Sequence, residues 1–202
     1  MQTDPLTDAP EAASAQLQAH GRPSTLVSDW FGAQFSQLHP LLQQLHQNGG
    51  VLRGEIRIDF GPGIAGWVGR RLARSLGIPV DRARCGFEVD ISHTADALHW
   101  NRRFENGATM RSTFTPSGHW PHGHWSESTG TFRLDLGVDT TNGAWHWIPK
   151  RAYWHGLCVP ITLLPQTRAG KWIEDERYVF RVELVAPLLG LLLRYHGALD
   201  AQ

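Results

Sequence analysis

Histidines gather in one short stretch of the sequence, His119-Trp120-Pro121-His122-Gly123-His124, and Glu127 follows three residues later. In a strand, alternate side chains point to the same face, so His122 and His124 can ligate one metal ion together. His119 or Glu127 then supplies the third ligand. These residue types at this spacing predict a metal site, and the ion that they suit is a single divalent metal.

The order His-x-His followed by Glu is similar to the metal-binding pattern of the cupins. In that pattern the Glu lies one or two residues further along, and a second histidine motif follows, which Asn142 and His146 do not reproduce. Ser117, Gly118 and Gly123 favour a loop in which the histidines are simply solvated. A metal-dependent enzyme, in which the ion polarises the substrate or activates water, is therefore an alternative hypothesis.

Aromatic and polar side chains alternate along residues 145–155. If this segment is one regular strand, a single face carries Trp145, Trp147, Pro149, Arg151, Tyr153 and His155. Such a face is typical of a pocket wall, which combines apolar area with a few convergent polar groups. The alternative is that the aromatic rings fill an ordinary barrel interior while Arg151 extends to solvent. His155 is the candidate general base of such a pocket.

The segment Gly61-Pro62-Gly63-Ile64-Ala65-Gly66 matches the Gly-x-Gly-x-x-Gly pattern of dinucleotide sites. In those sites the glycines let the backbone approach a pyrophosphate. The preceding segment alternates with charged residues, whereas a central parallel strand is apolar on both faces. No further strand–helix units follow. We therefore expect a turn that starts a helix here, and a nucleotide cofactor is not expected.

The composition bears on several classes of protein. Lys+Arg and Asp+Glu both number 19, so the net charge is zero and nucleic-acid binding is not expected. Two cysteines, Cys85 and Cys158, cannot build a disulfide framework and indicate a reducing compartment, so we expect a cytoplasmic protein. The longest apolar stretch, residues 184–193, is about half of a bilayer span and is interrupted by Pro187 and Gly190. No membrane span is therefore expected.

Helices are expected near the beginning of the chain. Residues 1–26 are rich in Ala, Gln, Asp, Pro and Ser without periodicity, and they predict a mobile tail without a secretory signal. A helix should follow, because apolar residues recur there at spacings of three and four: Phe31, Phe35, Leu38, Leu42 and Leu45. Pro40 lies inside it, so we expect either a kink or two short helices that meet there. A second amphipathic helix is expected from about Ile64 to Leu76.

From residue 85 onward the sequence has the pattern of strand after strand, at intervals of about ten residues. Asn106-Gly107 and Asn142-Gly143 are typical of tight turns between antiparallel strands. We therefore predict one α+β domain over residues 27–199, mainly antiparallel β. Eight or so strands should form a meander that closes into a barrel or a strongly curved sheet, with the two N-terminal helices packed on it.

Three segments carry a resemblance to a known family: Leu76-Gly77-Ile78-Pro79, residues 100–104 with the sequence WNRRF, and residues 187–199 with the sequence PLLGLLLRYHGAL. Taken in this order they resemble an uncharacterised bacterial family, domain of unknown function 4166 (DUF4166). The resemblance implies a role in small-molecule metabolism and a functional link to a nicotinamide-dependent dehydrogenase, because members often lie next to such domains. The family has no established catalytic residues to carry over. Residues 119–125 and 145–154 depart from its pattern, so features particular to this protein are expected there.

Together these observations favour a protein that binds an apolar or amphipathic small molecule in an aromatic-lined internal pocket. Strand alternation predicts the following residues on the pocket wall: Trp100, Arg102, Arg111, Trp147, Arg151, Tyr153, His155 and Tyr195. A third hypothesis is a non-catalytic interaction domain whose Trp- and His-rich loop docks a protein or a sugar. The sequence assigns neither a reaction to the pocket nor an oligomeric state to the chain.

Overall fold

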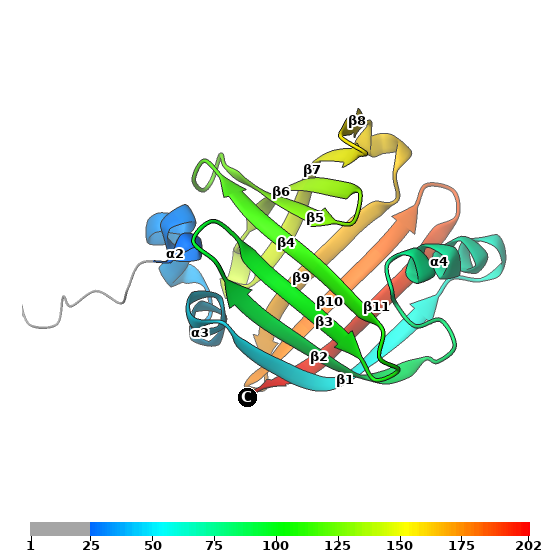
Figure 1. The fold of residues 1–202 in the computed structure, drawn as a ribbon, viewed down its shortest axis with the longest axis horizontal. Helices are drawn as coiled ribbons and strands as arrows, with labels where there is room; N and C mark the ends of the chain where they lie inside the picture. The colour runs from blue at the N-terminus through cyan, green and yellow to red at the C-terminus, as the bar shows by residue number, and fades with distance from the viewer. Residues whose placement is uncertain (1–24) are drawn as a thin grey trace, which may run out of the picture.

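Ten antiparallel strands close on themselves as a barrel in this computed structural model, which describes residues 25–202 (Figure 1). The strands are β1 (Gly50–Phe60), β2 (Arg84–His93), β3 (Leu98–Phe104), β4 (Thr109–Ser117), β5 (His124–Thr129), β6 (Phe132–Asp139), β7 (Trp145–Trp154), β9 (Gln166–Glu174), β10 (Arg177–Ala186) and β11 (Gly190–Ala201), with a short β8 (Leu157–Val159) beside β7. The helices are α2 (Leu26–Phe31), α3 (Pro40–Asn48) and α4 (Gly63–Ser75), with 3-10 turns η1 (Gly32–Gln37), η2 (Thr141–Gly143) and η3 (Ile161–Leu163). The predicted antiparallel barrel with helices near its N-terminus is confirmed, and its ring has ten strands rather than eight or so.

The ring closes through two junctions. β1 pairs with β11, so that Ile58 lies opposite Tyr195. The other junction is formed by β7, whose first residues pair with β9, so that Trp145 lies opposite Lys171. The last residues of β7 pair with β8 instead. β7 and β9 therefore separate toward the end of the barrel where β8 and η3 lie.

Pro40 divides the N-terminal helical region, as expected. α2 begins after Thr25, whose hydroxyl accepts a hydrogen bond from the backbone N–H of Ser28 in a capping box. α3 begins at Pro40 itself, a position where the missing N–H is not needed. The predicted tail, residues 1–26, lies outside the described residues except for Thr25, which caps α2, and Leu26, which is its first residue. None of the helices in residues 25–202 is long and apolar enough to cross a bilayer.

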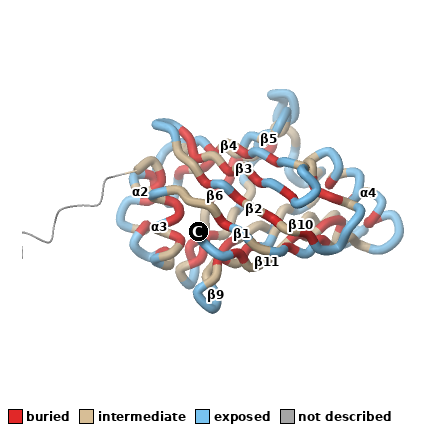
Figure 2. The backbone as a smooth tube through the Cα atoms, turned by 60° about the horizontal axis from the view of Figure 1, so that its bottom comes forward, coloured by how far each residue is buried: buried red, intermediate tan, exposed pale blue. Residues whose placement is uncertain are grey.

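Aromatic side chains fill the end of the barrel beneath α2 and α3. α2 places Trp30 against Trp125 of β5 and Phe31 against Trp145 of β7, with ring centroids 5.5 and 4.8 Å apart. We call these four residues the aromatic plug, and all of them are buried. Figure 2 shows buried residues along the strands of the barrel and exposed ones along α4. The aromatic plug therefore closes one end of the barrel.

α4 crosses the opposite end of the barrel and packs on β11 through glycines (Figure 1). A Cβ atom at Gly69 would collide with the carbonyl oxygen of Leu192, and one at Gly61 would collide with that of Leu191. Gly66 likewise leaves room for the carbonyl oxygen of Gly61. Glycines of the Gly-x-Gly-x-x-Gly segment thus contact the chain's own backbone, where they let the start of α4 approach β11.

Gly69→Ala should destabilise the protein, although the same substitution in an ordinary helix stabilises it by about 1 kcal/mol. The added methyl group forces α4 away from β11, at a cost of about 1–3 kcal/mol, so the midpoint of urea unfolding should fall. Gly86→Ala is the matched control, because the nearest atom to its Cβ is the Cβ of Glu105 at 3.5 Å. A Gly69→Ala midpoint at or above the wild-type value would contradict the close packing of α4.

Candidate functional site

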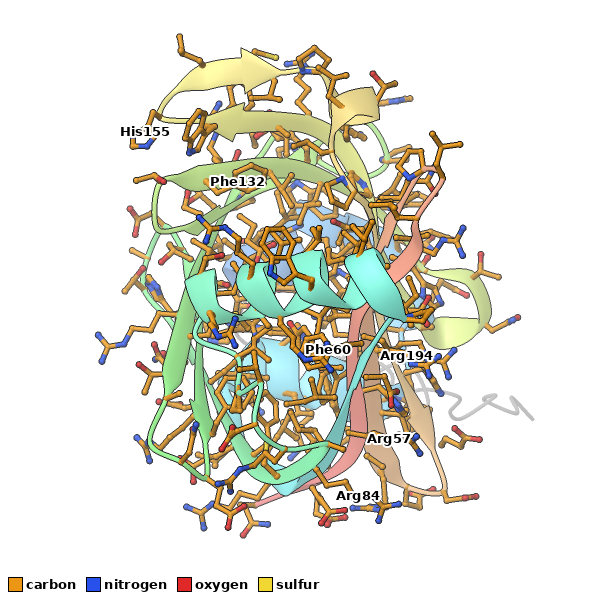
Figure 3. All side chains as sticks on the ribbon, turned by 90° about the vertical axis from the view of Figure 1, so that its right-hand side faces the viewer. Arg57, Phe60, Arg84, Phe132, His155 and Arg194 are labelled. Carbon is orange, nitrogen blue, oxygen red and sulfur yellow. The ribbon has the colours of Figure 1, made fainter. Side chains whose placement is uncertain are left out.

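A cavity of about 1290 Å³ occupies the part of the barrel interior that lies toward α4. Its wall is formed by α4, by strands on both sides of the barrel and by the segment from β8 to η3. The wall is mainly apolar and includes Leu76, Met110, Leu134, Val182, Leu184 and Leu193. Figure 3 looks at this end of the molecule, with α4 across the barrel and Phe132, another lining residue, above the helix.

The polar side chains on the cavity wall include Arg102 from β3, Glu127 from β5 and Tyr195 from β11. Nη1 of the buried Arg102 donates a hydrogen bond to Oγ of Ser112 at 2.9 Å. Within residues 25–202 this is the only hydrogen bond of the guanidinium, so its other N–H groups remain available to a ligand. Burial raises the pKa of Tyr195, which keeps its hydroxyl protonated. The cavity therefore offers hydrogen-bond donors and, at Glu127, an acceptor.

A buried lysine lies beside the aromatic plug. Nζ of Lys171 lies 3.8 Å from the ring centroid of Trp145, 4.1 Å from that of Trp100 and 5.4 Å from that of Trp147. The same nitrogen is 2.5 Å from Nε2 of His46, to which it donates a hydrogen bond. Lys171 is only 2% exposed, so its environment consists of indole rings and this imidazole.

Burial lowers the pKa of Lys171 well below the usual lysine value, and the positive charge of Arg102 lowers it further. Glu127 and the indole faces, which attract a cation, oppose this shift. Burial likewise lowers the pKa of His46, and Lys171 adds to the lowering. His46 is therefore neutral: its Nδ1 donates to the carbonyl of Leu42 at 2.9 Å, and its Nε2 accepts from Lys171.

Neither Lys171 nor His46 was expected as a site residue from the sequence. A weak signal exists for Lys171, because it is one of only two lysines in a chain that otherwise uses arginine. It also falls within a predicted strand, where every second side chain points inward. His46 carries no such signal, since a histidine in the last turn of a helix is an ordinary surface residue.

Two of the eight residues expected on the pocket wall, Arg102 and Tyr195, line the cavity. Trp100 and Trp147 lie in the adjoining aromatic packing instead. Their rings lie 5.5 and 5.3 Å from that of Phe114, and both contact Lys171. A contact between these two indoles and a ligand stays a prediction.

Arg111 is exposed on the outer side of β4, so the expectation that it faces the interior is wrong. The tight turn between β3 and β4 pairs Arg102 with Met110. Residues opposite each other on paired strands share a face, so Met110 points inward with Arg102, and its neighbour Arg111 points outward.

The regular alternation expected along β7 is also wrong, because the strand contains a bulge. Leu136 pairs with Pro149 and Asp135 pairs with Arg151, which leaves Lys150 as an extra residue. After the bulge Ala152 is buried, Arg151 is exposed and the ring of Tyr153 contacts Arg133 outside the cavity.

His155 lies in the exposed turn after β7 (Figure 3). Its φ of 48° is a turn conformation, and its ring contacts Trp154. The candidate general base is therefore not among the residues that line the cavity.

The structure does not bring together the four residues expected as metal ligands. His119 and His122 are exposed in the loop between β4 and β5. His124 begins β5 with its Nε2 3.8 Å from Oδ2 of Asp135, whereas Glu127 lines the cavity. Residues three apart on a strand face opposite sides. In the part of the chain that the structure describes, no group of three or more His, Cys, Asp or Glu residues could hold a metal ion.

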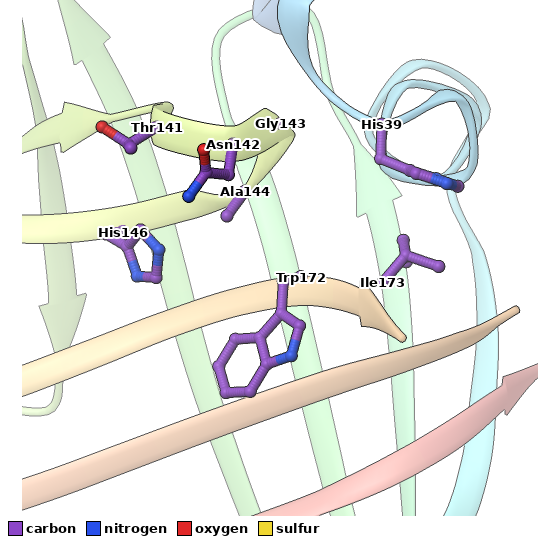
Figure 4. A pocket seen from close by; sticks show the side chains of 8 residues that line it. All are labelled: His39, Thr141, Asn142, Gly143, Ala144, His146, Trp172 and Ile173. Atoms are coloured by element: carbon purple, nitrogen blue, oxygen red, sulfur yellow. The ribbon is translucent and has the colours of Figure 1, made fainter. Parts of the chain in front are cut away.

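A second pocket, of about 340 Å³, lies between the start of α3 and the turn η2 (Figure 4). Its lining includes His39, Asn142, His146 and Trp172. His146 and Trp172 alternate with the inward-facing residues of β7 and β9, so this pocket lies outside the barrel wall. Its volume is about a quarter of that of the internal cavity, which remains the main candidate site.

Comparison with known proteins agrees with the resemblance found in the sequence. A family model described as "Domain of unknown function (DUF4166)" matches residues 38–199. The match begins just before α3 and ends within β11, so it covers nearly the whole barrel and both sides of the cavity. No curated protein matches the chain.

Replacing Lys171 with methionine should change how stability depends on pH. In the unfolded chain a lysine stays protonated up to about pH 10, whereas burial lowers the pKa of Lys171 in the fold. The unfolded state then binds more protons, so this lysine makes the unfolding free energy rise with pH, by up to about 1.4 kcal/mol per pH unit. The unfolding free energy, measured with urea at about pH 7 and about pH 9, should therefore increase more between these two pH values in wild type than in Lys171→Met. Identical slopes would show that Lys171 keeps its ordinary charge in the fold.

Proposed function

This chain belongs to the DUF4166 family, and we propose that it binds one apolar or amphipathic small molecule inside its barrel. The observation that carries the proposal is the internal cavity of about 1290 Å³. Its wall is mainly apolar, and its charged side chains are few, namely Arg102 of β3, Glu127 of β5 and Arg168 of β9. Sites for small molecules combine these properties, because apolar area supplies affinity and a few polar groups fix orientation.

The size and lining of the cavity indicate the class of ligand. Pockets for drug-sized molecules measure about 300–1,000 Å³, so this cavity suits a larger molecule, such as a lipid-like chain or a fused ring system. Apolar surface removed from water contributes about 25 cal/mol per Å². A ligand that covers the apolar wall therefore gains most of its affinity from burial.

Arg102, Tyr195 and Glu127 favour one orientation of the ligand. The guanidinium of Arg102 and the hydroxyl of Tyr195 donate hydrogen bonds, and the positive charge of Arg102 favours a strongly accepting oxygen. Glu127 accepts hydrogen bonds and disfavours a second negative charge nearby. The polar end of the ligand is therefore a carboxylate or hydroxyl held by Arg102, and the apolar body extends toward α4.

Substitutions of similar size at Arg102 and Glu127 should have opposite effects on an anionic probe. Dansylaminoundecanoic acid joins a carboxylate to an apolar chain, and its fluorescence rises in apolar surroundings. Arg102→Met removes a charge-assisted hydrogen bond of about 1.5–3 kcal/mol, so the Kd of the probe should rise about 10- to 100-fold. Glu127→Gln removes a negative charge from the cavity, so the Kd should fall.

The matched control is the double variant His122→Ala, His124→Ala, because neither imidazole lines the cavity. Its Kd should equal that of wild type, whereas the alternative of a metal-dependent site needs both histidines. Urea unfolding of each variant checks that the barrel is intact. An unchanged Kd in Arg102→Met, or loss of probe binding in the histidine variant, would overturn the proposed site.

A further inference from the structure

Exposed apolar side chains surround the end of the barrel where the cavity lies. Ile64 and Trp67 of α4 are 70% and 66% exposed, Leu163 of η3 is 76% exposed, and Leu188 in the β10–β11 turn is fully exposed. We call these four residues the apolar rim. The three segments that carry them also contribute residues to the cavity wall, and they lie at the α4 end of the molecule (Figures 1 and 3). Large apolar side chains gathered around one opening indicate a contact surface.

Arginines accompany the apolar rim. Arg70, Arg71 and Arg74 are exposed on α4, and Arg168 lines the cavity from β9. Among the described residues none of these four forms an ion pair with an acidic side chain, whereas arginines such as Arg53 and Arg194 do. The net charge of the chain is zero, so this end of the barrel carries a local excess of positive charge.

We propose that this end of the barrel docks on the surface of an anionic phospholipid bilayer. Ile64, Trp67, Arg70, Arg71 and Arg74 recur at spacings of three and four, which places them on one exposed side of α4. Apolar and indole side chains next to arginines are typical of helices that lie in the lipid interface, where the rings enter the headgroup region and the arginines meet anionic lipids.

The shape of the surface also favours a bilayer over a protein partner. A partner's helix or strand needs one continuous groove or a free sheet edge. The apolar rim is instead divided among α4, η3 and the β10–β11 turn, with the opening of the cavity between them. A bilayer surface can receive such separate side chains at once, because it deforms around each of them.

The role of this docking rests on the proposed function: the docked barrel receives its apolar ligand directly from the bilayer. An apolar chain that leaves a bilayer for water exposes each of its methylene groups. With the rim in the lipid interface, the ligand passes from the bilayer into the cavity without crossing water. The ligand class is therefore a membrane lipid or a single-chain amphiphile that partitions into membranes.

Vesicle sedimentation of the full chain tests the docking. Vesicles of phosphatidylcholine containing phosphatidylglycerol should bind the protein, vesicles of pure phosphatidylcholine should bind it far less, and added salt should release it. Replacing Arg70, Arg71 and Arg74 with glutamine should lower the partition coefficient about 100-fold, from roughly fivefold for each arginine. Trp67→Ala should lower it roughly tenfold.

Matched controls carry the same changes away from the rim. Glutamine in place of the exposed Arg111, Arg151 and Arg181 removes equal charge from the outer wall of the barrel. Trp172→Ala removes an indole from the second pocket, outside the cavity. Both controls should bind vesicles as wild type does. Equal losses in test and control variants would overturn the docking.

The dansyl probe separates the docking from the proposed function. Trp67→Ala should weaken vesicle binding yet keep the wild-type Kd for the probe, because Trp67 does not line the cavity. Wild-type protein that binds the probe but neither kind of vesicle would overturn the docking and leave the cavity function standing. A dimer that Trp67→Ala abolishes, without vesicle binding, would assign the rim to a second copy of the chain instead. Vesicle binding without probe binding would support the docking and refute the proposed function.

Discussion

A closed ring of ten strands encloses an interior that is wider than ordinary side chains fill. The rest of the structure depends on which side chains occupy this interior and on how much of it they leave empty. Beneath α2 the chain supplies large rings: Trp125 of the wall packs against Trp30 of the helix, and Trp145 of the wall packs against Phe31. Toward α4 the inward side chains are mainly aliphatic, as at Leu134 and Val182, and a cavity remains. The same barrel thus has a packed core at one end and a cavity at the other.

Polar side chains are found inside this barrel although burial disfavours them. Lys171 is held by indole faces and His46, and Arg102 is held by Ser112. Replacing buried charged groups with apolar ones is often neutral or stabilising, so their presence is not explained by stability alone. Arg102 and Glu127 both line the cavity, and the proposed binding function gives them a role that packing does not, namely to orient an amphipathic ligand.

The fold was more predictable than the site. Alternation in β1 and β2 and the turn at Asn106-Gly107 are local signals, and they were sufficient for an antiparallel barrel. The site depends on which residues face inward, and one extra residue at Lys150 reverses the faces of Arg151 and Tyr153. Glu127 was expected beside His124 at a metal, yet strand alternation places it at the cavity. No sequence pattern reports a cavity, because its volume depends on side chains that meet only when the ring closes.

Native mass spectrometry tests most directly the central claim that the barrel holds one ligand. The protein is mixed with a long-chain fatty acid, and its native mass is compared with its denatured mass. The account predicts one adduct of a few hundred daltons on wild type, lost on denaturation and absent from Leu134→Trp, whose larger side chain occupies the cavity. A wild-type protein without an adduct, or an equal adduct on the filled variant, would contradict it.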